Sequence, residues 1–265
     1  MEKENINMTI TEKNNIIPKI IFVIPYRDRE QQYNFFMHHM QNVMSDYSDN
    51  EYKFIFIHQC DKRDFNRGAM KNIGFLFVKN EYPDNYKDIT LVFNDIDSMP
   101  YVKNFLNYET EFGNVKHFYG FNFTLGGIVS IKAGDFEKTN GFLNLWAWGY
   151  EDNAFQNKVK SNNLNIDRSV FYPIYDKNIL NISDKPTRTV NEIEYKKYNQ
   201  NINDGFDKLK NIKYDFDRET HFVNVTAFDT FHSYNDKYNK EHNFAKNGNI
   251  PFKSSRNKST MRMIM

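Results

Sequence analysis

The chain has 265 residues, of which 40% are hydrophobic and 17% aromatic, and 35 Lys and Arg nearly balance 34 Asp and Glu for a formal net charge of +1. This apolar content is enough for a substantial core, which excludes general disorder, and the single cysteine excludes a disulfide scaffold. The near-neutral charge excludes a general nucleic-acid binder, and no apolar run reaches the roughly 18 residues of a membrane span.

Strand and helix signals alternate along the first part of the chain. Residues 19–26 form a nearly continuous apolar run, typical of a strand buried on both faces, and residues 30–44 place apolar side chains at helical spacing. A second strand is predicted over residues 52–58, a second helix over 66–78 and a third strand over 88–94. This order predicts an α/β fold with a largely parallel sheet and helices on both faces.

The second half has weaker signals. Strand-like runs surround Gly126-Gly127 within residues 117–136, and residues 151–160 read as a short helix entered through two acids. Residues 181–211 are polar and predict a loop with some helix, whereas residues 221–228 alternate like a last strand.

We expect one domain over residues 19–236, preceded by a polar segment over residues 1–18 and followed by a basic, mobile tail over residues 237–265. The polar N-terminus lacks the apolar stretch of a signal peptide, so we expect a soluble, cytoplasmic protein. Abundant Asn, Lys and Ile indicate an AT-rich genome, for example a viral one.

Charged residues follow the first and third predicted strands, in Pro25-Tyr26-Arg27-Asp28-Arg29 and Asn94-Asp95-Ile96-Asp97. The carboxyl ends of parallel strands meet at one edge, where ligands bind. Arginines suit the oxygens of a diphosphate, and alternate aspartates suit a divalent cation that bridges them. Each pattern also fits a solvated surface, and Asp215-Phe216-Asp217 repeats the spacing with no apolar strand immediately before it.

The segment Phe65-Asn66-Arg67-Gly68 opens the second helix. Asn66 is a natural N-cap, whereas Arg67 in the first turn opposes the helix dipole. An arginine in this unfavourable position indicates that it binds a ligand such as a phosphate or a nucleobase. The alternative is an exposed arginine that lowers stability very little.

Residues 140–153 contain the highest concentration of candidate functional residues. They contain Trp146, Trp148 and Gly149 directly before Glu151 and Asp152. Acids at a helix start are often only favourable caps. Flat indole rings favour sugar stacking, however, and desolvation beside them raises the proton affinity of a carboxylate, which suits a general base.

Taken in order, these segments resemble the β-1,4-galactosyltransferase family of inverting glycosyltransferases. The matching patterns are Pro-Phe-Arg-x-Arg at Pro25 to Arg29, Phe-Asn-Arg-Ala at Phe65 to Gly68, Asp-Val-Asp at Asp95 to Asp97, Phe-Gly-Gly-Val at Leu125 to Ile128, and Trp-Gly-Trp-Gly-Gly-Glu-Asp at Trp146 to Asp152. The resemblance covers roughly residues 19–230. It implies a GT-A (Rossmann-like) fold with a mixed, mostly parallel sheet flanked by helices, in a soluble form without a membrane anchor.

The resemblance implies a role for each matching residue. On the donor side it implies Pro25, Arg27 and Arg29 at the diphosphate, Phe65 and Arg67 at the uridine and phosphates, Asp95 at the donor sugar, Gly127 beside the donor, and Asp97 as a ligand of Mn²⁺ or Mg²⁺. On the acceptor side it implies Tyr150 and Glu151 as binding residues, Trp148 on a loop that closes over the donor and builds the acceptor site, and Asp152 as general base.

The implied activity is transfer of galactose or N-acetylgalactosamine from UDP-Gal or UDP-GalNAc to a hydroxyl of a glycan or glycoconjugate acceptor, with inversion. Asp152 deprotonates the acceptor, and the divalent metal and arginines neutralise the leaving diphosphate.

The sequence departs from the family pattern at three places. No histidine lies between His117 and His221, so the family's Met/His metal ligands are replaced by Asn178-Ile-Leu-Asn181, with Asp176 and Asp184 nearby. Such oxygen donors suit Mg²⁺ or Mn²⁺ held more loosely. Thr124 replaces a tyrosine that limits room at the sugar's second carbon, and Asn153 replaces a third acid, which leaves Asp152 as the candidate base.

Other interpretations remain open. The same fold serves transferases that use another sugar nucleotide or retain configuration, and it also serves a non-catalytic module that binds a sugar or a nucleotide sugar. The basic tail is either a solvated terminus or a contact for an anionic partner. The identity of the acceptor and the oligomeric state stay open.

Overall fold

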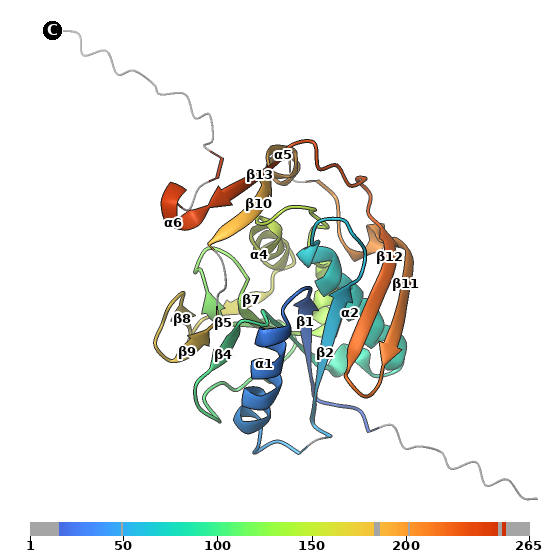
Figure 1. Cartoon of the computed structure of the whole chain (residues 1–265). Helices are drawn as coiled ribbons and strands as arrows, with labels where there is room; N and C mark the ends of the chain where they lie inside the picture. The colour runs from blue at the N-terminus through green and yellow to red at the C-terminus, as the bar shows by residue number, and fades with distance from the viewer. Residues whose placement is uncertain (1–15, 49, 183–185, 201, 249–250, 253–265) are drawn as a thin grey trace, which may run out of the picture.

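A mixed sheet forms the centre of the computed structural model, which describes residues 16–48, 50–182, 186–200, 202–248 and 251–252 (Figure 1). Within these residues the sheet has nine strands, in the order β11-β12-β2-β1-β3-β6-β5-β7, with β8 paired to β5. The strands are β1 (Ile20–Tyr26), β2 (Tyr52–Gln59), β3 (Thr90–Asn94), β5 (Asn114–Gly120), β6 (Ile128–Lys132), β7 (Asn165–Asp167), β8 (Tyr172–Pro173), β11 (Lys210–Asp217) and β12 (Phe222–Asp229).

Helices and two smaller sheets surround this sheet. The helices are α1 (Glu30–Val43), α2 (Arg67–Glu81), α3 (Ala133–Thr139), α4 (Glu151–Ser161), α5 (Glu192–Asn199) and α6 (Phe244–Asn247), with short 3₁₀ turns η1 (Tyr86–Asp88) and η2 (Phe206–Lys208). The smaller sheets pair β10 (Thr187–Asn191) with β13 (Asn239–Asn243), and β4 (Ser98–Pro100) with β9 (Ile179–Asn181).

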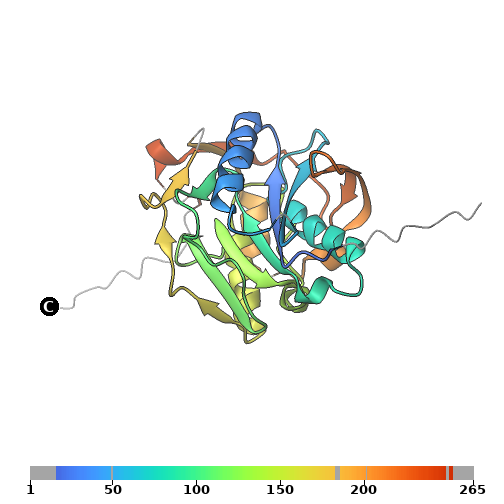
Figure 2. The ribbon, with the colours of Figure 1, turned by 90° about the horizontal axis from the view of Figure 1, so that it is seen from below.

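Strand β1 is buried on both faces, as its continuous apolar run predicted. Phe22 and the residues that share its face pack toward Phe36 of α1. Val23, on the opposite face, packs toward Met70 and Ile73 of α2. Seen from below, α1 and α2 accordingly lie on opposite sides of the sheet (Figure 2). These two helices fix the position of β1.

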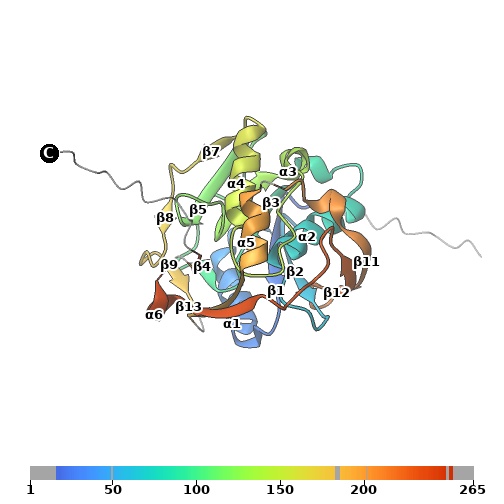
Figure 3. The same cartoon turned by 90° about the horizontal axis from the view of Figure 1, so that it is seen from above.

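Strands β12, β2, β1 and β3 are mutually parallel, so their carboxyl ends meet at one edge of the sheet. Strand β6 runs antiparallel to β3, which makes the sheet mixed, as the resemblance implied. Helices α4 and α5 and the β10–β13 pair lie over the carboxyl edge (Figures 1 and 3). The predicted α/β fold class is therefore confirmed, and the candidate site lies at the expected edge.

The structure corrects the expected C-terminal boundary. A mobile tail was expected from residue 237, but residues 239–247 form β13 and α6, and β13 pairs along its whole length with β10. Strand β13 reads Asn-Lys-Glu-His-Asn, which has no apolar alternation, so only its partner strand reveals it. Strand β10 within the expected loop was missed for the same reason, whereas α5 is the helix expected there.

Residues 1–15, which are most of the expected polar N-terminal segment, and residues 253–265 at the end of the expected tail lie outside the described residues. Among the residues that the structure does describe, no helix combines the length and the apolar character that crossing a bilayer requires.

The close packing of α2 against the sheet leads to a stability prediction. Gly74 faces β1 and β2, and a methyl group there would overlap the side chain of Val23. Alanine normally stabilises a helix relative to glycine by about 1 kcal/mol, but we expect Gly74→Ala to lower the free energy of unfolding by about 1–3 kcal/mol through overpacking. Urea denaturation checks this. Asn34→Ala, at an exposed position of α1, is the control and should leave stability unchanged or slightly raised; a Gly74→Ala variant as stable as the control contradicts the packing described.

Candidate active site

The predicted donor-side charges meet at the carboxyl edge of the sheet. Asp95 and Asp97 follow β3, Arg29 precedes α1, and Arg67 begins α2. Asp97 interacts electrostatically with Asp95 and with both arginines. Arg67 also acts on Glu151 at the start of α4. The structure therefore brings the donor-side residues and the acidic helix start to one place.

The Asp97 carboxyl group is buried beside a second acid. Burial raises its pKa, and the neighbouring Asp95 raises the pKa further. A hydrogen bond from Ser98 Oγ to Asp97 Oδ1 (3.1 Å) and the two arginines act in the opposite direction. Because a buried carboxylate is stabilised by nearby positive charge, this position favours a bound cation.

A third arginine, Arg188, joins the site from β10. It interacts with Asp97 and Asp95 and also with Arg67, which repels it. Burial, followed by this repulsion, lowers the pKa of Arg188. Sequence reasoning missed Arg188, because it lies in a polar, lysine-rich stretch where one more cation is not a distinctive signal. The cluster of Arg29, Arg67 and Arg188 is suited to a polyanion such as a diphosphate.

The segment expected to replace the family's metal ligands does lie beside Asp97. The backbone N–H of Ile182 donates to the Asp97 carbonyl (2.7 Å), and Asn181 Nδ2 donates to Ser98 Oγ (3.3 Å). Asp176 instead accepts hydrogen bonds within its own turn from Asn178, and Asp184 lies outside the described residues.

Within the described ranges, no group of three or more His, Cys, Asp or Glu side chains is placed to hold a metal ion. The carboxylates of Asp97 and Asp95 lie together here, and the Asn181 amide contacts Ser98, which hydrogen-bonds to Asp97. Such hard oxygen donors fit Mg²⁺ or Mn²⁺ when phosphate oxygens of a nucleotide complete the coordination.

Arg27 supports the loop after β2. Its guanidinium donates to the carbonyl of Arg63 (2.6 Å) and to that of Asp61 (2.7 Å). Pro25 is buried within β1, opposite Ile57 of β2. Both residues shape the edge from which Arg67 projects, and their expected contacts with the diphosphate stay predictions.

Helix α2 begins as the sequence predicted. Asn66 caps it by accepting a hydrogen bond from the backbone N–H of Ala69 (2.9 Å). The Arg67 guanidinium lies 5.1 Å from the ring centroid of Phe65, in cation–π geometry. This pair forms a flat surface beside the charged cluster.

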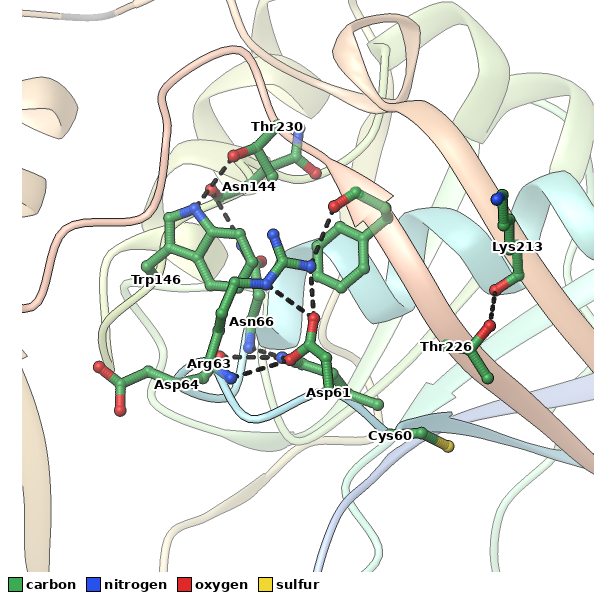
Figure 4. A network of polar contacts seen from close by, with 12 residues as sticks. Cys60, Asp61, Arg63, Asp64, Asn66, Asn144, Trp146, Lys213, Thr226 and Thr230 are labelled. Atoms are coloured by element: carbon green, nitrogen blue, oxygen red, sulfur yellow. Dashed lines mark hydrogen bonds and ion pairs between the residues drawn. The ribbon is translucent and has the colours of Figure 1, made fainter.

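Figure 4 shows Arg63 reaching Asp61 and lying against Trp146. The Arg63 guanidinium lies 4.4 Å from the Trp146 ring and 4.5 Å from the Phe228 ring, and its Nε donates to Asp61 Oδ2 (2.7 Å). Trp146 is 2% exposed, and its indole N–H donates to Thr230 Oγ1 (3.0 Å). Of the two tryptophans expected to favour a sugar, Trp146 is therefore a structural residue.

Trp148 lies on the turn before α4 and is only half-buried. Its backbone N–H donates to the Thr189 carbonyl of β10 (2.9 Å), and its ring packs 4.6 Å from that of Phe244 in α6. The turn continues through Gly149 and Tyr150 at φ +102° and +74°. Positive φ is strained for a tyrosine, and strain of this kind is concentrated at functional sites.

The two acids that begin α4 have different surroundings. Glu151 is 4% exposed, and its Oε2 has no hydrogen-bond partner among the described residues. Burial, with a further contribution from Asp152, raises the pKa of Glu151 to about 7, against the opposing effects of Arg67 and Lys71. Asp152 is more exposed and accepts a hydrogen bond at Oδ1 from Lys71 Nζ (2.9 Å).

Two glycines allow Asp152 and Asp95 to lie close to the same loop. A methyl group on Gly126 would overlap Asp152 Oδ2, so only glycine leaves room for this carboxylate. Gly127 has φ +77°, and its carbonyl accepts a hydrogen bond from the Asp95 backbone N–H (3.0 Å). The Gly-Gly pair therefore joins Asp152 to Asp95 and the charged cluster.

Comparison with known proteins gave consistent matches. The sequence profile for the N-terminal region of glycosyl transferase group 7 matches residues 11–109, and that for the N-terminal domain of galactosyltransferase matches residues 106–177. A Caenorhabditis elegans xylosylprotein 4-beta-galactosyltransferase is 29% identical over 57% of this chain and 53% of the relative. Mouse beta-1,4-galactosyltransferase 4 is 29% identical over 59% and 47%. The chain thus spans about half the length of the curated relatives it matches.

The catalytic domain of Drosophila beta-1,4-galactosyltransferase 7, solved with xylobiose, superposes with a TM-score of 0.61 at 19% identity, covering 79% of this chain and 94% of that one. A mutant of that enzyme, solved with manganese, UDP-Gal and xylobiose, gives a TM-score of 0.59. At this identity the likeness shows that the fold is shared.

The buried Glu151 generates a pH prediction. Because its pKa is about 7 in the folded chain against 4.5 ordinarily, the stability it contributes is present below about pH 4.5 and is lost as the pH rises toward 7. Between pH 5 and pH 8 we expect the free energy of unfolding to fall by about 1–3 kcal/mol more in wild type than in Glu151→Gln. Urea denaturation of both proteins at both pH values measures this, and equal changes would show that Glu151 ionises normally.

Proposed function

The chain belongs to the β-1,4-galactosyltransferase family of glycosyl transferase group 7, and we propose that it transfers a hexose from a UDP-sugar to a hydroxyl of a glycan or glycoconjugate, with inversion at the anomeric carbon. One observation carries this proposal. Arg29 and Arg67, which suit a diphosphate, and Asp97, which suits its cation, lie at one edge of the sheet together with the acidic start of α4.

The donor lies, in this proposal, across the arginine cluster. The pyrophosphate contacts Arg29, Arg67 and Arg188, and the uridine lies against Phe65. The sugar lies toward Asp95 and Gly127, which the hydrogen bond between them holds together. Thr124, a short and largely buried side chain, supports either galactose or N-acetylgalactosamine as the transferred sugar.

A divalent cation, Mn²⁺ or Mg²⁺, is part of the proposal. Asp97 and the amide oxygen of Asn181 would hold it together with diphosphate oxygens. When bound, it supplies Lewis-acid stabilisation of charge on the leaving group. The arginine cluster supplies further positive charge from the chain itself, so we expect metal dependence to be weaker than a site with an imidazole ligand would give.

Chemistry takes place at Asp152. The acceptor hydroxyl passes its proton to Asp152 Oδ2 while its oxygen forms a bond to the anomeric carbon. The bond from that carbon to the diphosphate oxygen breaks on the opposite face, and its electron pair leaves with UDP. Glu151, largely protonated below neutral pH, donates a hydrogen bond within the acceptor site, and Trp148 and Tyr150 cover the reacting groups and exclude water.

The donor is identified by calorimetric titration of UDP, UDP-Gal, UDP-GalNAc and UDP-Glc, with and without Mn²⁺, followed by linkage analysis of products from glycan acceptors. We expect UDP-Gal or UDP-GalNAc to bind and to yield a β-linked product. Binding without turnover on any acceptor would favour the non-catalytic module. An α-linked product would exclude the inverting mechanism.

Replacement of the base separates chemistry from binding. General-base help is worth about 10²–10⁴-fold, so we expect Asp152→Asn to lower kcat by that factor while UDP binding changes little. Asp215→Asn on the exposed edge strand β11 removes the same charge far from the site and should retain full activity. Undiminished turnover in Asp152→Asn removes this residue from the mechanism.

A further inference from the structure

A lysine inside the core contacts the proposed base. Lys71 projects from α2, its side chain is 2% exposed, and its Nζ lies 2.9 Å from Asp152 Oδ1. The ammonium group also lies 4.6 Å from the ring centroid of Phe142. A fully buried ammonium group lowers the stability of a protein unless it is paired with an opposite charge. Packing alone therefore does not explain a lysine at this position.

Several charged groups surround this ammonium. Three carboxylates act on it, those of Asp152, Asp95 and Glu151. Burial lowers the pKa of Lys71, but these charges outweigh burial and raise the pKa above its ordinary value. Lys71 is therefore a cation at neutral pH.

The Lys71 contact fixes the orientation of the Asp152 carboxylate. Oδ1 is held by Lys71, Oδ2 lies over the bare Cα of Gly126, and the Asp152 carbonyl accepts a hydrogen bond from the Leu125 backbone N–H (3.2 Å). One carboxylate oxygen is thus engaged, and the other is left as the proton acceptor.

The adjacent acid has no such partner. Lys71 Nζ donates a hydrogen bond to Asp152, whereas Glu151 Oε2 is buried and has no hydrogen-bond partner among the described residues. Environments that differ in this way give neighbouring carboxyl groups different roles.

We propose that Lys71 is a positioning residue for the base: its ion pair with Oδ1 orients the Asp152 carboxylate beside Glu151, so that Oδ2 accepts the acceptor proton. This role rests on the proposed transferase function. Without Lys71, Asp152 loses its ion pair and keeps the adjacent acid Glu151.

The test compares Lys71→Met, which keeps the volume and removes the charge, with Lys71→Arg, which keeps the charge. Lys79→Met is the control, because Lys79 lies on the same helix but pairs with Glu137 at a partly exposed position. For Lys71→Met we expect kcat at pH 7 to fall about 10–100-fold, as is usual when a group that orients a functional residue is lost, with little change in the donor KM.

The pH profile distinguishes positioning from packing. In Lys71→Met the acidic limb of the kcat profile should move up by about 1–3 pH units, because a nearby opposite charge has been removed. Activity should recover toward alkaline pH, and Lys71→Arg should restore much of the loss at pH 7. A profile that keeps its shape in Lys71→Met, with no rescue by arginine, would reduce Lys71 to a packing residue and overturn the proposal.

A second readout does not depend on turnover. Carbon-13 NMR of labelled aspartate carboxyl groups, with the Asp152 signal assigned from Asp152→Asn, follows the titration directly. We expect this signal to titrate at higher pH in Lys71→Met than in wild type, and the same range in both proteins would overturn the proposal. If no donor is turned over by wild type, the transferase function fails, while the NMR result still decides whether Lys71 controls the charge of Asp152.

Discussion

Charge balance at one edge of a buried sheet governs this structure. Four acids gather there, Asp95, Asp97, Glu151 and Asp152, and four cations interact with them, Arg29, Arg67, Lys71 and Arg188. Because burial makes unpaired charge costly, each group constrains the others. Glu151 is largely protonated below neutral pH, which leaves an excess of positive charge that a diphosphate can neutralise.

The elements around the site depend on one another beyond these charges. Trp148 is tied through its backbone to β10 and through its ring to α6, and Arg188 comes from the same β10. Strand β10 is in turn held by β13 alone among its strand neighbours in the described chain. The C-terminal β13 therefore supports both the turn before α4 and the third arginine. Movement of the β10–β13 pair would change both together.

Local sequence patterns predicted much of this site and missed what depends on distant contacts. The run of β1, the Asn66 cap and the charges after β1 and β3 are visible because each is a short-range pattern with a direct structural meaning. Arg188 was missed because its neighbours in sequence are polar, and Trp146 was misjudged because Arg63 and Phe228 bury it. Lys71 did leave a signal: residues 68–78 of α2 are apolar except for Lys71 and Asn72, so a lysine among them is expected to be buried and paired.

The claim on which this account depends is that the arginines and acids form a single site for a nucleotide diphosphate. Calorimetric titration of UDP into wild type, Arg67→Met and Arg218→Met tests it most directly. Arg218 is the control, because it is an exposed arginine directly after β11 that contacts Glu81 and Phe216. We expect UDP to bind wild type and Arg218→Met equally, and Arg67→Met about 10–100-fold more weakly, the usual cost of losing a hydrogen bond between charged groups. Equal affinity in all three proteins, or no binding to wild type, would contradict the account.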